Sequence, residues 1–109
     1  MSCKIDIHTH VFHEKIAEKA TEFVGKYYNL EMHGGGIAET LISNAKDINV
    51  QGFLIHSSAT KPQQVVNVND FIAEYAAKDK IFIGFGTIHK DFANIEEELK
   101  RVKELGLKG

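Results

Sequence analysis

The sequence contains one cysteine, Cys3, and no apolar run long enough to cross a membrane or to act as a secretion signal. One thiol cannot form a disulfide within the chain, which favours a reducing compartment, so we expect a cytoplasmic protein. The 13 basic and 15 acidic residues give a formal charge of only −2, so the chain lacks the positive field that binds nucleic acids or acidic membranes. These absences argue against secreted, membrane-spanning and nucleic-acid-binding proteins.

The sequence also lacks any stretch that would divide it into domains. It has no linker-like segment, no low-complexity tract and no block of like charge. With 109 residues, of which 43% are hydrophobic and 26% charged, residues 1–109 are the size and composition of one globular domain. Tryptophan is absent and there is a single proline, but histidine occurs six times, which is high for so short a chain.

Hydrophobic periodicity alternates between strand-like and helix-like along the chain. It predicts strands near residues 4–10, 52–55 and 81–85, helices near 13–26, 37–48, 62–78 and 95–105, and the entry to another strand at 107–109. Alternating strands and helices imply an α/β protein with parallel strands and right-handed crossovers. Three strands that lead into a fourth are too few for a buried parallel sheet. We therefore expect a partial domain, the N-terminal three to four βα units of a (β/α)8 barrel. A small open three-layer α/β domain is the alternative.

The last predicted helix has clear terminal signals. Asn94 and Glu97 have the spacing of a capping box at its start, and Glu97 is four residues before Arg101 on its outer side. Leu99 belongs to the apolar stripe expected to face inward, and Glu98 to a run of three glutamates expected to face solvent.

The most informative motif is the run Ile-Asp-Ile-His-Thr-His at residues 5–10. His8 and His10 are two apart on a strand, so they share a face with Cα atoms roughly 6.6 Å apart. Their ring nitrogens can converge to about 2.0–2.1 Å from one divalent ion. The same alternation puts Asp6 deeper on that face, where it could orient an imidazole. Two structural histidines on a half-exposed strand are the alternative reading.

A catalytic zinc site usually takes three protein ligands and keeps one position open. His56 and His89, which follow the second and third predicted strands, are the candidates within the chain for a third ligand. His13 and His33 have weaker claims because they fall at a helix start and in a loop. We favour remaining ligands from a segment outside these 109 residues, with His56 and His89 as loop histidines on the substrate side.

Three segments, taken together, resemble one protein family. Residues 5–10 resemble the opening signature of the amidohydrolase superfamily, which comprises metal-dependent hydrolases on a (β/α)8 barrel. The passage NDFIAEY at 69–75 with IFIGFGTI at 81–88 resembles the amidohydrolase-related branch, also called amidohydrolase 2. Residues 97–109, from EEL to ELGLKG, resemble the segment that introduces the fourth strand of that branch.

The resemblance implies that His8 and His10 are metal ligands for a divalent ion, most simply zinc. It implies hydrolysis of a C–N or related bond in a small-molecule substrate by metal-activated water. The other ligands and the catalytic acid of the family come from the fifth strand onward, so no catalytic residue is expected in this chain. Phe12, His56 and His89 would line the substrate pocket.

Other functions remain open at this point. The same branch contains metal-dependent non-oxidative decarboxylases. Phosphoesterases of the polymerase-and-histidinol-phosphatase type and barrel-type deoxyribonucleases also open with His-x-His, although the later segments fit them poorly. A non-enzymatic alternative is an inactive truncated fragment that self-associates into a homo-oligomer through exposed strand edges.

Overall fold

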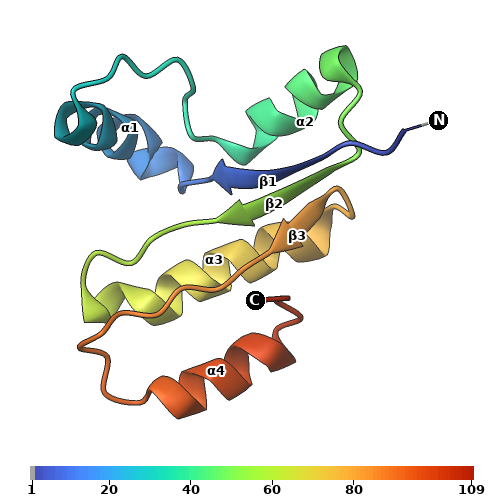
Figure 1. Ribbon diagram of the computed structural model, residues 1–109. Helices are drawn as coiled ribbons and strands as arrows, with labels where there is room; N and C mark the ends of the chain where they lie inside the picture. The colour runs from blue at the N-terminus through green and yellow to red at the C-terminus, as the bar shows by residue number, and fades with distance from the viewer. Residues whose placement is uncertain (1) are drawn as a thin grey trace.

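The computed structural model describes residues 2–109 as an α/β fold (Figure 1). In chain order the elements are β1 (Ile5–His10), α1 (Glu14–Tyr28), α2 (Ala38–Ile48), β2 (Gly52–His56), the 3₁₀ turn η1 (Pro62–Gln64), α3 (Val65–Lys78), β3 (Phe82–Gly84) and α4 (Ile95–Glu104). The predicted order and type of every helix and of the three main strands are confirmed, with bounds that differ by a few residues. None of the helices in residues 2–109 is both long and apolar enough to span a membrane.

The three strands form one parallel sheet in the order β1-β2-β3. Phe53 on β2 is the register partner of Phe82 on β3, and Leu54 is that of Ile83. Residues 107–109 run beside the end of β3, because the amide of Lys108 donates to the carbonyl of Gly84 at 2.9 Å. The predicted entry to a further strand is not part of the sheet, which has three strands, although these residues make backbone hydrogen bonds with residues 84 and 86.

One face of the sheet carries the hydrophobic core. Phe53, Ile55 and Phe82 point to this face, and α2, α3 and α4 cover it (Figure 1). The buried core is made of apolar side chains from all these elements: Val11, Ala38, Ala45, Phe53, Ile55, Ile72, Ala73, Phe82, Val102 and Leu107. Leu54 and Ile83 lie on the opposite face and are only partly buried. The sheet is thus unequal, with one face packed by helices and the other more open.

The helix ends follow local sequence signals. Asn29 after α1 and Asn49 after α2 are left-handed, with φ of 53° and 56°, a conformation that asparagine tolerates better than most residues. Gly106, which has φ of 84°, follows α4 in the left-handed conformation that glycine adopts without strain. Pro62 begins the 3₁₀ turn that leads into α3, where its missing amide costs no hydrogen bond.

Helix α4 departs from the sequence prediction in its inner face. Asn94 is the N-cap residue but makes no side-chain capping bond, so the predicted capping box is wrong. Glu98 is buried, with 5% of its surface exposed, whereas Leu99 is 53% exposed. Arg101 pairs with Glu98 and Asp70 rather than with Glu97. Glu98 thus lies on the inner side of α4 together with Val102, and its Oε1 accepts a hydrogen bond from the side-chain amide of Asn69 on α3.

Candidate metal centre

Three histidines lie together at the carboxyl ends of β1 and β2. One ring nitrogen from each of His8, His10 and His56 lies within 4.8 Å of the other two. The Nε2 atoms of His8 and His10 are 3.2 Å apart, and the ring centroids of His10 and His56 are separated by 4.2 Å. Among the described residues, this is the only group of three or more potential ligands with such spacing.

The separation of the two Nε2 atoms fits a shared metal ion. Two imidazole nitrogens that bind zinc tetrahedrally at about 2.0–2.1 Å are about 3.3 Å from each other. The 3.2 Å between His8 and His10 is close to that value. The donor set is made of nitrogen atoms alone, which suits zinc and other late divalent transition metals better than calcium or magnesium.

Strand pairing positions the third histidine. His10 on β1 and His56 on β2 are direct register partners in the parallel pair, so their side chains project from the same face. Thr9 is the partner of Ile55 and lies on the buried face, where its hydroxyl donates to the carbonyl of Leu54 at 2.6 Å. The three imidazoles consequently stand on the more open face of the sheet.

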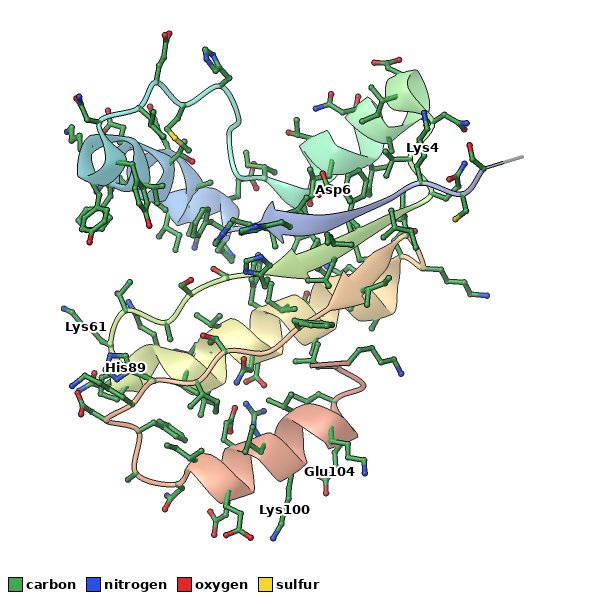
Figure 2. All side chains as sticks on the ribbon, in the orientation of Figure 1. Lys4, Asp6, Lys61, His89, Lys100 and Glu104 are labelled. Carbon is green, nitrogen blue, oxygen red and sulfur yellow. The ribbon has the colours of Figure 1, made fainter. Side chains whose placement is uncertain are left out.

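The alternation predicted for β1 is broken by an irregularity. The register with β2 shifts between Asp6 and Thr9, and Asp6 is the partner of Phe53, whose side chain is in the core. Asp6 therefore lies on the opposite face from His10, on the side of α2 (Figure 2). Its carboxylate accepts a hydrogen bond from the backbone amide of His8 at 3.1 Å. The prediction that Asp6 shares the face of the histidines is wrong, because a bulge between them reverses the parity.

The surroundings of His10 and His56 favour the neutral form of these two imidazoles. The pKa of His10 lies below its ordinary value of 6.5 because of partial desolvation of the ring, and also because of the proximity of His56 and His8. The pKa of His56 is lowered by desolvation and then by His8. Neutral imidazole is the form that binds a metal ion, so this arrangement reduces proton competition near neutral pH.

The other predicted site residues lie at different distances from this group. Phe12 stacks on His10 with ring centroids 6.5 Å apart. His89 lies in the segment after β3, outside the histidine group, where its Nδ1 accepts from the amide of Asp91 (Figure 2). His13 caps α1 by accepting from the amide of Lys15. His33 is exposed in the loop between α1 and α2.

The structure thus brings together His8 and His10, the two ligands predicted from the motif, and adds His56. The sequence offered one signal for His56, its place at the end of the second strand. That signal applied equally to His89 after the third strand. Strand order distinguishes His56 from His89. β2 is hydrogen-bonded directly to β1, which carries His8 and His10, whereas β3 is one strand further away.

Comparisons of the chain with protein-family models, with curated proteins and with solved structures find no match. The resemblance to amidohydrolases, which comes from three short motifs, therefore stays a prediction.

Proposed function

We propose that this chain forms the first βα units of a metal-dependent hydrolase of the amidohydrolase-related family, with His8 and His10 as metal ligands. The observation that carries the proposal is the 3.2 Å between their Nε2 atoms at the carboxyl end of a parallel strand. His56 belongs to the same group and is the candidate third ligand or substrate contact.

The topology supports a barrel-type parent fold. Strands that follow one another in space as they do in sequence, joined by right-handed crossovers, place every helix on the same face of the sheet. The core here is confined to the face of Phe53 and Phe82, under α2, α3 and α4. Doubly wound open sheets instead reverse their strand order and carry helices on both faces. In a barrel, the face that holds His56 would be the interior, and the carboxyl ends of the strands hold the active site.

The chemistry follows from the donor set. A divalent ion such as zinc would supply Lewis-acid activation of water for attack on a C–N or related bond. The contribution of this chain is to hold the ion through His8 and His10, in a setting that lowers the pKa of His10. The proposal assigns no proton-transfer residue to residues 2–109; a complete active site takes further ligands and an acid from later strands.

Metal binding tests the ligand assignment directly. We expect the chain to bind zinc with a 1:1 stoichiometry, measured by titration calorimetry and elemental analysis after dialysis. The double variant His8→Ala/His10→Ala should bind at least about 100-fold more weakly, because a bidentate histidine pair is lost. His33→Ala is the matched control, since His33 is an exposed histidine outside the group. Equal zinc content in the double variant and in wild type would refute the assignment.

The reaction class is tested in a protein that carries this segment within a whole barrel. Release of amine from N-acyl substrates would support hydrolysis, whereas release of carbon dioxide from carboxylic acids would assign the decarboxylation known in the same branch. Turnover unaffected by His8→Ala/His10→Ala would contradict both reactions at this site.

A second candidate function, self-association, has one specific observation in its favour. β1 is the edge strand of the sheet, and its Ile5 and Ile7 are 49% and 73% exposed. An exposed apolar edge strand offers unpaired backbone groups to a second copy. Sedimentation over a hundredfold range of concentration tests this candidate, and a monomer throughout would count against it.

A further inference from the structure

A cavity opens directly beside the histidine group. It has a volume of about 350 Å³ and is bounded by His10 on one side. Its wall is formed by uncharged residues of α1 and of the segments after β1, α1 and β2: Phe12, Thr21, Val24, Tyr28, Met32, Gly34, Gly36 and Ser58. We call this the His10 cavity. Its volume is within the range of small-molecule sites, about 300–1,000 Å³.

The lining of the His10 cavity carries no formal charge apart from a protonatable His10. Lysine, arginine, aspartate and glutamate are all absent from the residues that bound it. Two aromatic rings, Phe12 and Tyr28, and the side chains of Val24 and Met32 supply most of the apolar surface. A charged group would lose hydration in this cavity without gaining an ionic partner, so the cavity suits an uncharged ligand portion.

The far wall of the cavity is fixed in place. The amide of Phe12 donates to the carbonyl of Gly36 at 2.7 Å, which ties the loop after α1 to the segment after β1. Gly36 has φ of +70°, and a Cβ atom there would lie 2.8 Å from Cδ2 of Phe12. Only glycine allows this approach without strain. The ring of Phe12 is thereby held between the loop and His10, on which it stacks.

A second cavity borders the His10 cavity at Phe12 and Val24. This second cavity, of about 590 Å³, shares Phe12, Val24 and Ser58 with the first and extends between α1 and α3. Ile16 and Phe23 of α1 line this second cavity, and 53% and 66% of their surfaces are exposed. These apolar side chains of α1 thus line a cavity next to the His10 cavity instead of joining the core.

From the uncharged lining of the His10 cavity and its position beside His10, we propose that it binds the uncharged, apolar body of a ligand whose oxygen-donor head binds at the His8, His10 and His56 group. The ligand class is an aryl or branched alkyl compound with a carbonyl, carboxylate or hydroxamate at one end. This inference rests on the proposed metal site and adds the specificity of the neighbouring cavity. Phe12 and Val24 are its specificity-determining contacts.

Two hydroxamates that differ only in their body test the proposal. Acetohydroxamate and benzohydroxamate present the same metal-binding head, but only the second carries an apolar ring. Calorimetric titration of the zinc-loaded chain should show benzohydroxamate binding roughly tenfold tighter or more, because the cavity removes its ring from water. Val24→Glu should reduce this preference to about twofold, because a carboxylate in the cavity wall disfavours the apolar ring.

A matched control and a second variant keep the result interpretable. Val66→Glu makes the same substitution at an exposed valine of α3 outside the cavity and should keep the full preference. Met32→Lys changes an exposed side chain of the cavity wall, so it should preserve folding and still reduce the preference.

Each outcome has a distinct meaning. Equal affinity for the two hydroxamates in the zinc-loaded wild-type chain would overturn the cavity inference and leave the metal site intact. A preference that survives both Val24→Glu and Met32→Lys would also overturn it, because the ring would then bind elsewhere. Failure of the wild-type chain to take up zinc would overturn the proposed function, and the cavity inference with it.

Discussion

We expect replacement of the buried Asn69 to lower the free energy of unfolding strongly. Its side chain is fully buried, with 0% exposed, between α3, α4 and the segment after β3. Its Nδ2 donates to the carbonyl of Thr87 at 3.1 Å and to Oε1 of Glu98 at 2.8 Å. Its Oδ1 accepts from the amide of Thr87 at 2.7 Å. One side chain therefore satisfies both backbone groups of Thr87 and one oxygen of a buried carboxylate.

The expected loss follows from these three hydrogen bonds. Asn69→Leu has a similar volume, so it removes the polar contacts while limiting cavity formation. Two bonds to neutral groups contribute about 0.5–1.5 kcal/mol each, and the bond to the carboxylate about 1.5–3 kcal/mol. The free energy of unfolding should fall by about 4 kcal/mol, out of a total of about 5–15 kcal/mol for a domain. The groups left without partners are the reason for so large an effect.

Urea unfolding followed by circular dichroism measures the difference. With a slope of about 1–3 kcal/mol per molar urea, a loss of 4 kcal/mol shifts the midpoint by about 2 M. Asn67→Leu is the matched control, because Asn67 is an exposed asparagine on the same helix and should change stability by less than about 0.5 kcal/mol. A loss below about 1 kcal/mol in Asn69→Leu would show that the network does not hold α4 to α3.

Three further predictions concern other parts of the molecule. The hydrogen bond from Arg101 lowers the pKa of Glu98 in the folded protein. The ionised Glu98 should therefore stabilise the wild-type protein relative to Glu98→Gln above pH 4.5, and this difference should be lost as the pH falls through the lower folded-state pKa. Urea unfolding of both proteins from pH 7 to pH 2 measures the difference. Zinc at 100 times its dissociation constant should raise the free energy of unfolding by about 2.7 kcal/mol in wild type and not in His8→Ala/His10→Ala, as measured by urea unfolding at fixed free zinc. Gly36→Ala should cost about 1–2 kcal/mol in chemical unfolding because of its positive φ, with Gly35→Ala, where a Cβ meets nothing within 4 Å, as a nearly neutral control.

The element order was predictable because each helix and strand carries its own local pattern. The buried run at 52–55 and the turn residues Asn49, Pro62 and Gly106 mark boundaries by physics that acts over a few residues. The inner face of α4 was not predictable in this way. Glu98 is buried because Asn69, 29 residues earlier, provides a partner, and no pattern within the helix reports a partner on another element.

The candidate site was predictable to a similar degree. The two-residue spacing of His8 and His10 correctly placed both imidazoles on one face, because the chain between them remains extended. The same rule failed for Asp6, since the irregularity between Asp6 and Thr9 is set by pairing with β2. His56 joined the group through that same pairing. Local periodicity therefore indicated the pair of candidate ligands, and strand register decided which other residues lie beside them.

The two faces of the sheet divide stability and chemistry between them. The buried network of Asn69 and Glu98 and the apolar core lie on the helix side, whereas the three histidines stand on the open side. One hydrogen bond links the helix side to the histidine side. The side chain of Asn69 binds the backbone of Thr87, and the hydroxyl of Thr87 accepts a hydrogen bond at 3.4 Å from the amide of Ala59, in the loop that follows His56. Substitutions on the helix side should therefore lower stability strongly and metal affinity only modestly. Substitutions of the histidines should remove metal binding while leaving the stability of the metal-free fold nearly unchanged.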